Sequence, residues 1–127
     1  IDTLALNHPD GAVGYRVEHG NKVVCYITDH EHKKNIKNDK LIKFIKNSDL
    51  LIYDSTYKDE EFSNYVGWGH STWQEGVRLS NYSNVKKYAI YHHNPDNRDN
   101  IMKKIEEEAK LLGDHIIVAK EGMCVKI

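Results

Sequence analysis

Short polar clusters that contain histidine or aspartate follow several of the apolar segments of this chain. They comprise residues 7–9, 28–32, 53–56, 69–72 and 91–95. In open α/β sheets the loops that follow strands are where sites are built, so we expect these clusters to converge. Imidazole and carboxylate groups together suit zinc, manganese or iron. The pattern therefore predicts a metal-dependent hydrolase.

The cluster at 28–32 offers two carboxylates and two imidazoles directly after an apolar run. Asp29 there could bridge two metal ions with its two oxygens, and the plainer interpretation is a turn aspartate. His30 and His32 could add ligands from the same loop, and exposed histidines explain them equally well. On these residues alone both interpretations of Asp29 stay open, and we do not predict His30 or His32 as ligands.

Three further histidines follow or precede apolar segments. Pro9 holds His8 in an extended conformation, which suits either a ligand or an ordinary loop histidine. His92 and His93 end the apolar run at 88–91. Adjacent side chains of an extended segment point to opposite faces, so we expect only one of this pair to face a site.

A histidine and an aspartate suggest acid–base chemistry. His70 lies between Gly69 and Ser71 at a predicted helix start, where the helix dipole favours a neutral imidazole or a bound anion. A histidine at this place can donate to a phosphoryl oxygen or protonate a leaving group. Asp54 at a strand end could hydrogen-bond to His70, orient its ring and raise its pKa. The alternatives are a capping-loop histidine and an exposed aspartate.

The elements that must position these residues form one structural unit, residues 1–127. Apolar runs and alternation predict strands at 13–17, 23–27, 50–53, 88–91, 115–119 and 123–127. Helical periodicity predicts helices at 38–47, 71–81 and 99–112. We expect Ser71 to cap the second helix with Gln74 as its capping-box partner, and Gly113 to end the third. The fold class is α/β (α+β), in the order β-β-α-β-α-β-α-β-β, with hairpins formed by the first and last strand pairs.

Composition excludes some classes of function. The formal net charge of −1 gives no electrostatic case for nucleic acid or an anionic membrane. No run approaches the roughly 20 apolar residues of a membrane span. Cys25 and Cys124 are expected to be buried reduced thiols, which indicates a reducing compartment, the cytoplasm. A mean hydropathy of −0.68 is polar for a compact domain, so something outside this sequence could cover part of its apolar surface.

The clusters resemble, in order and spacing, those of the metallo-β-lactamase-fold hydrolases, in the branch of ribonuclease Z and related phosphodiesterases. The segments that carry the resemblance are 6–17, 26–29, 50–57, 69–73 and 91–95. They resemble the family's third-motif histidine segment, bridging-aspartate strand, carboxylate box, His-Ser-Thr loop and last metal histidine. The resemblance implies that His8 and His92 each bind one ion and that Asp29 bridges both. It implies that His70, oriented by Asp54, assists catalysis.

The resemblance also implies cofactors, substrate and an absent part. Two divalent ions, zinc or else manganese or iron, would activate water against a phosphodiester such as a nucleotide or RNA. The family's His-x-His-x-Asp-His motif is absent from this sequence and belongs to the first half of an αββα sandwich. We therefore expect a C-terminal half-domain that alone is weakly active or inactive. The alternative is a non-catalytic half-domain that dimerises or pairs with a separate N-terminal half.

Overall fold

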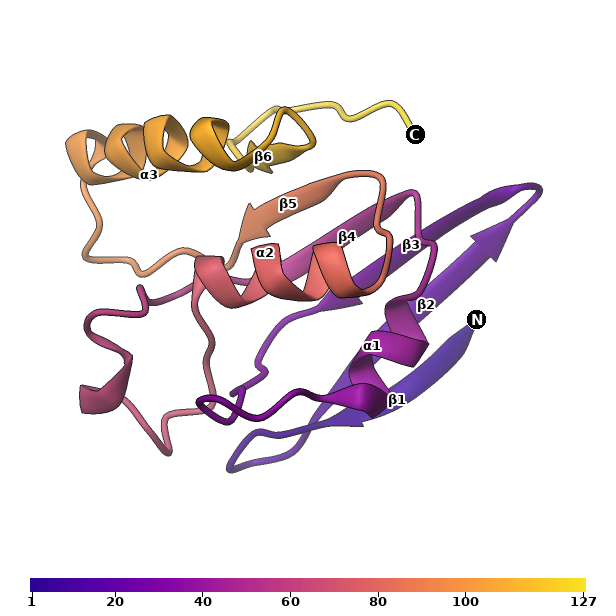
Figure 1. The fold of residues 1–127 in the computed structure, drawn as a ribbon, viewed down its shortest axis with the longest axis horizontal. Coiled ribbons are helices and arrows are strands. Elements are labelled where there is room, and N and C mark those ends of the chain that lie inside the picture. The colour runs from indigo at the N-terminus through magenta and orange to yellow at the C-terminus, as the bar shows by residue number, and fades with distance from the viewer.

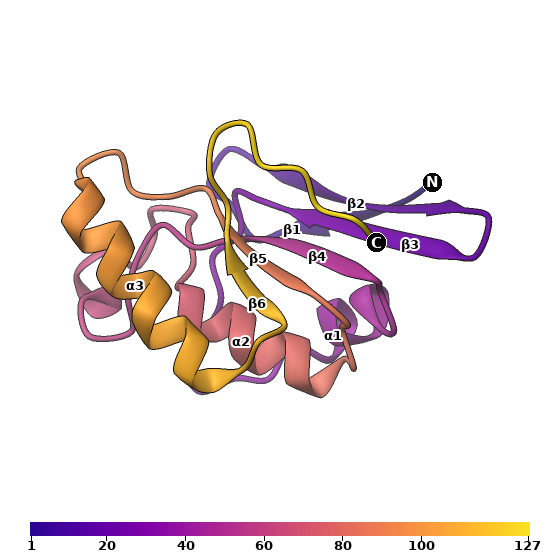
Figure 2. The same ribbon diagram turned by 90° about the horizontal axis from the view of Figure 1, so that it is seen from above.

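The computed structural model describes residues 1–127 and contains one six-stranded sheet with three α-helices on the same face (Figures 1 and 2). The strands are β1 (Asp2–Leu6), β2 (Ala12–His19), β3 (Lys22–Ile27), β4 (Leu50–Asp54), β5 (Tyr88–Tyr91) and β6 (Ile116–Val118). The helices are α1 (Asp39–Ile45), α2 (Trp73–Tyr82) and α3 (Asp99–Leu112), with a short 3-10 helix η1 at Phe62–Asn64. The predicted mixed α/β class is confirmed.

The strands lie in the sheet in chain order, and the sheet changes direction once. β1, β2 and β3 pair antiparallel, whereas β3, β4, β5 and β6 pair in parallel. Each parallel pair is joined by one of the helices, which pack back onto the sheet. The carboxyl ends of β3, β4 and β5 therefore meet at one edge, and three of the polar clusters follow them there.

The two faces of the sheet differ in what covers them. On the helix side, alternate strand residues such as Cys25, Ile27, Leu51 and Tyr53 are fully buried in the core. On the other side, alternate residues of β2 are apolar and exposed. Val13, Tyr15 and Val17 expose 45%, 44% and 39% of their area. Figure 2 shows the C-terminal tail crossing to this side. Much of this face is apolar and lacks a covering layer.

The predicted order of elements is wrong at both ends of the chain. β1 was not expected, yet its five residues pair with β2 from Asp2 opposite Arg16 to Leu6 opposite Ala12. The predicted strand 123–127 does not form, and Met123 and Ile127 are 44% and 40% exposed. The predicted turn at Glu121 and Gly122 does form, but the chain after it does not pair with β6 as a strand. The hairpin of β2 and β3 is confirmed.

Two smaller expectations are also corrected. The N-cap of α2 is Thr72 rather than Ser71, because the Thr72 Oγ1 accepts the Glu75 N–H at 3.1 Å. Cys25 is buried as expected, but Cys124 is exposed on the C-terminal tail, and both thiols are free.

Gly113 ends α3 as expected. None of the helices has the length and apolar character needed to cross a bilayer.

We predict that Thr72→Ala lowers the free energy of unfolding by about 1 kcal/mol or more, because it removes the hydroxyl that caps α2 and also donates to the Asp59 Oδ1. Thr72→Ser keeps a hydroxyl at the same place and serves as the matched control. Urea denaturation should show a lower midpoint for Thr72→Ala with an unchanged slope. Equal midpoints for the two variants would show that the cap contributes nothing.

Candidate functional site

The carboxylate of Asp54, at the end of β4, is fully buried and accepts hydrogen bonds from several segments. Its Oδ2 accepts the Asp29 N–H at 2.9 Å, and its Oδ1 accepts the Ser71 N–H at 3.1 Å and the Thr56 hydroxyl at 3.0 Å. The His70 Nδ1 lies 3.0 Å from Oδ2. One charged group thus connects the loops after β3 and β4 with the residues that precede α2.

The predicted hydrogen bond between Asp54 and His70 is confirmed. This bond raises the pKa of His70 above its ordinary value, although partial burial opposes the effect. Burial also works to raise the pKa of Asp54, but the hydrogen bonds from His70 and the Ser71 amide outweigh it, so that this pKa is lowered. Asp54 therefore stays ionised, and His70 keeps its proton to a higher pH than a free imidazole.

His92, directly after β5, turns its two ring nitrogens to two different carboxylates. Its Nδ1 lies 3.2 Å from the Thr56 hydroxyl and 3.5 Å from the Asp54 Oδ2. Its Nε2 lies 3.7 Å from the Asp29 Oδ1. The Asp29 carboxylate accepts no hydrogen bond in the structure, and its side chain is 43% exposed. Asp29 therefore has free oxygen lone pairs beside a free imidazole nitrogen.

Asp29 and His92 both hold the left-handed backbone conformation, with φ of 57° and 56°. The other non-glycine residues with positive φ are Asn35, Asn47 and Asn84, of the type that tolerates this conformation well. Aspartate and histidine also belong to the residue types enriched in this conformation. The left-handed turns at the ends of β3 and β5 thus coincide with the two residues whose free donor atoms face each other.

His8 reaches the same edge from the loop after β1. The backbone of Gly69, with φ +87°, lies against its ring, and a Cβ there would collide with the His8 ring atoms. The ring centroids of His8 and His70 are 5.9 Å apart. Gly69 is therefore required both for its backbone conformation and for the space that His8 fills.

The structure brings all five predicted site residues together in two overlapping groups. Donor atoms of His8, Asp29 and His70 lie within 4.8 Å of one another, and so do those of Asp54, His70 and His92. His70 belongs to both groups. The oxygens of Asp54 are already occupied by hydrogen bonds, so this residue anchors its neighbours. The individual roles of these residues stay predictions.

The remaining histidines of the clusters point elsewhere. His30 is buried beside the Tyr53 ring, and burial lowers its pKa to about 4. His93 lies with its Nε2 3.0 Å from the Ala119 carbonyl. The expectation that one of the pair at 92–93 faces the site is therefore confirmed, and the residue is His92.

His32 supports the site from the helix side. Its ring stacks on Phe62 with centroids 4.1 Å apart, and its Nδ1 lies 2.7 Å from the Ser71 hydroxyl. Burial lowers the pKa of His32 to about 4, so the ring is neutral. The Ser71 hydroxyl in turn lies 2.9 Å from that of Tyr53. This network holds the residue that follows His70.

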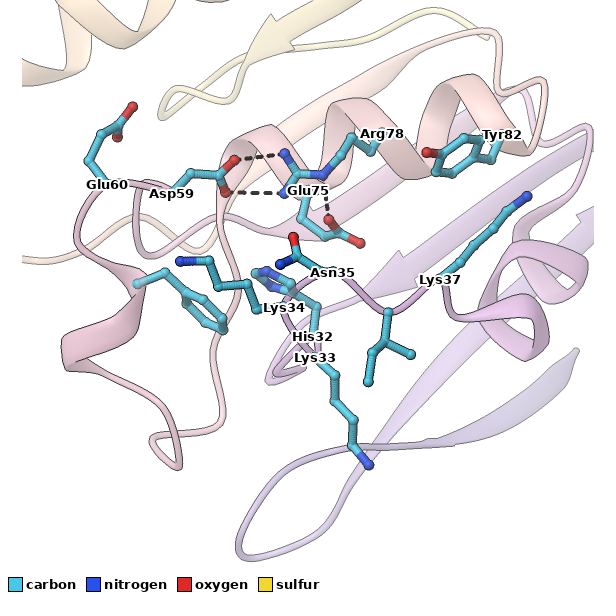
Figure 3. A pocket seen from close by; sticks show the side chains of 12 residues that line it. His32, Lys33, Lys34, Asn35, Lys37, Asp59, Glu60, Glu75, Arg78 and Tyr82 are labelled. Carbon is cyan, nitrogen blue, oxygen red and sulfur yellow. Dashed lines mark hydrogen bonds and ion pairs between the residues drawn. The ribbon is translucent and has the colours of Figure 1, made fainter.

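His32 also lines a cavity of about 620 Å³, and Figure 3 shows the side chains around it. Its wall contains Arg78, which pairs with Asp59 at 2.7 Å and Glu75 at 2.6 Å. Lysines of the loop 33–37 lie at its rim, so charges of both signs surround it. None of the five predicted site residues lines the cavity, and the guanidinium of Arg78 in its wall is already paired with Asp59 and Glu75. The strand-end cluster is therefore the better candidate for chemistry.

One residue that positions the site was not identified from the sequence. The Glu31 carboxylate accepts the N–H groups of Gly67 and Gly69, at 2.7 Å and 2.9 Å through the same oxygen. Its backbone also exchanges hydrogen bonds with Asn7, just before His8. Glu31 thus ties the loop before His70 to the loop that carries His8. The two glycines around Trp68 were the available signal, since closely spaced glycines often mark backbone N–H groups that bind an oxygen.

Comparison with known proteins places this geometry in a family. Residues 3–93 match the family model described as Beta-lactamase superfamily domain, and the chain belongs to this superfamily. It is 29% identical over 119 residues to a ribonuclease Z of Archaeoglobus fulgidus, covering 94% of this chain and 36% of that protein. A ribonuclease Z of Gemmatimonas aurantiaca is 28% identical over 86 residues, covering 65% of this chain and 26% of that protein.

Solved structures show the same fold. The metallo-β-lactamase fold protein YhfI of Bacillus subtilis superposes with a TM-score of 0.72 at 22% identity, over 95% of this chain and 46% of that one. The short form of human tRNase Z gives 0.70 at 18% identity, over 98% of this chain and 42% of that one. The resemblance seen in the sequence motifs is thereby confirmed. The chain spans less than half the length of each of these four proteins.

We predict that Glu31→Ala speeds hydrogen exchange of the amides at 67 and 69, because it removes their shared acceptor. Glu31→Gln keeps one carbonyl oxygen and should retain part of the protection. Hydrogen–deuterium exchange resolved to residues 65–70 measures the effect, with the helix α3 amides as internal reference. Unchanged exchange in Glu31→Ala would contradict the positioning role.

Proposed function

We propose that this chain supplies part of the site of a dinuclear metal-dependent hydrolase that cleaves phosphodiesters. The observation that carries the proposal is the pairing of Asp29 with His92. Both residues hold the left-handed backbone conformation, and a free carboxylate oxygen lies 3.7 Å from an imidazole nitrogen. The histidine with a raised pKa, His70, lies beside them.

The donor set fits a divalent ion. A separation of 3.7 Å is too long for a hydrogen bond, whereas two ligand atoms that each lie about 2.1 Å from one ion fit it. The neighbouring carboxylate of Asp54 favours a proton on the Nδ1 of His92, which leaves Nε2 free to bind metal. His8, Asp29 and His92 would hold the ions, and zinc, manganese and iron all accept such ligands. Bound ions of this kind supply a hydroxide nucleophile and neutralise negative charge.

In this proposal His70 donates the proton and Asp54 orients the ring of His70. With its Nδ1 fixed on Asp54, His70 presents its Nε2 to the site. Its raised pKa keeps a proton there for donation to a phosphoryl oxygen or to the leaving group. Asp54 itself has no exposed surface, so it orients the imidazole and does not touch the substrate.

The uncovered sheet face supports the proposal that residues 1–127 form the C-terminal half of a sandwich. Val13, Tyr15, Val17 and Tyr26 expose apolar area where monomeric proteins rarely leave a contiguous patch. An N-terminal half packed on this face would cover it and bring the family's remaining metal ligands to the same edge. The isolated chain would then have weak activity or none. Pairing of this face with a second copy is the alternative.

The substrate proposal rests on the names of the relatives. Ribonuclease Z and tRNase Z are similar over nearly the whole of this chain. A phosphodiester of a nucleotide or RNA is therefore the proposed substrate.

We predict that His92→Ala and Asp29→Asn, in the natural protein that contains this chain, each remove metal and abolish phosphodiester hydrolysis. His70→Ala should retain metal and lower kcat about 10²- to 10⁴-fold, because it removes a proton donor. The matched control is His93→Ala, whose ring faces away from the site and should leave both properties unchanged. Elemental analysis and hydrolysis of bis(p-nitrophenyl) phosphate are the measurements. Full activity in His92→Ala would overturn the proposal.

A further inference from the structure

Trp68 lies at the surface two residues before His70, with 64% of its area exposed. The other tryptophan, Trp73, is 3% exposed in the core. Large aromatic side chains usually bury most of their area, and an exposed ring beside a candidate site needs a reason. Because consecutive Cα atoms are about 3.8 Å apart, the Cα atoms of Trp68 and His70 are at most about 7.6 Å apart.

A continuous row of rings connects this indole with the site. Trp68 packs perpendicular to Tyr65 with centroids 5.9 Å apart, and Tyr65 stacks on Tyr57 at 4.1 Å. Tyr57 meets His70 edge-on at 6.2 Å. The inner rings are thus already paired with one another. Trp68 ends the row and keeps most of its surface free for an additional ring.

The indole is also held in place before any ligand arrives. The backbone on both sides of Trp68 is fixed by Glu31, which accepts the amides of Gly67 and Gly69. The Trp68 amide itself donates to the Tyr65 carbonyl at 3.1 Å. An aromatic side chain presented on a fixed backbone loses little conformational entropy on binding. This loop is therefore suited to stack a flat ring at the outer end of the aromatic row that begins at His70.

We propose that Trp68 is a stacking platform for a nucleobase of the substrate whose phosphate group lies at His70, an inference that rests on the proposed phosphodiester chemistry. Stacking on an exposed aromatic ring accepts any base, since every base has a π face. The formal net charge of −1 provides no general attraction for a phosphate backbone. The stacked ring then makes the site prefer phosphodiesters that carry a base over those that carry only a sugar or an alkyl group.

Binding of adenosine 5′-monophosphate to the chain in the presence of a chelator tests the proposal without metal or turnover. The nucleotide should quench tryptophan emission in the wild type and not in Trp68→Phe, which retains only the buried Trp73. Equilibrium dialysis should show affinity weakened about tenfold in Trp68→Ala and largely retained in Trp68→Phe. The matched control is Val66→Ala, which trims an equally exposed neighbour and should bind like the wild type. Ribose 5-phosphate should bind more weakly than the nucleotide, and none of the three substitutions should change its affinity.

Several outcomes would overturn the platform. They are equal nucleotide affinity in Trp68→Ala and the wild type, equal affinity for ribose 5-phosphate and the nucleotide, and Trp68 emission that acrylamide does not quench. The last result would mean that another segment or a second copy covers the indole. Nucleotide binding with the expected pattern but no phosphodiester hydrolysis would support the role of Trp68 and contradict the proposed function. The two proposals therefore fail on different measurements.

Discussion

The arrangement of this edge of the sheet depends on the cost of burying one carboxylate. Asp54 has no exposed surface, and an ionised carboxylate in such a place is tolerated only when donors surround it. The donors come from the loop after β3, from Thr56 beyond β4 and from the residues just before α2. Satisfying a single charge therefore fixes three loops relative to one another. The imidazoles of His70 and His92 are oriented because each places a ring nitrogen beside the Asp54 carboxylate.

The parallel register explains why these groups meet at one edge. Ile27 lies opposite Tyr53, and Asp54 lies opposite Tyr91, so the residues after β3, β4 and β5 leave the sheet side by side. Left-handed backbone at Asp29 and His92 then turns both side chains toward the space above Asp54. Glu31 adds a second carboxylate that fixes the glycine-flanked loop before His70. The geometry is thus built from two satisfied carboxylates, while a third, on Asp29, is left free.

Features set by local pattern were predictable from the sequence, and features set by competition for partners were not. The strands β2 to β6 and the helices were found because their apolar period is clear, and the Asp54–His70 bond because a strand-end carboxylate and a helix-start histidine suit each other. Ser71 and Thr72 are equivalent as caps in sequence, but the Ser71 hydroxyl is engaged with His32 and Tyr53, which leaves Thr72 as the cap. Glu31 carried no periodic signal, since its partners are backbone amides 36 and 38 residues away.

An NMR titration of the histidine ring protons measures whether buried Asp54 controls the protonation of His70. The measurement is made in chelator, on the wild type and on Asp54→Asn, with the unfolded chain in urea as reference. We expect a His70 pKa above the unfolded value in the wild type, since the carboxylate favours imidazolium, and a return toward that value in Asp54→Asn. A wild-type His70 that titrates like the unfolded chain would contradict this expectation.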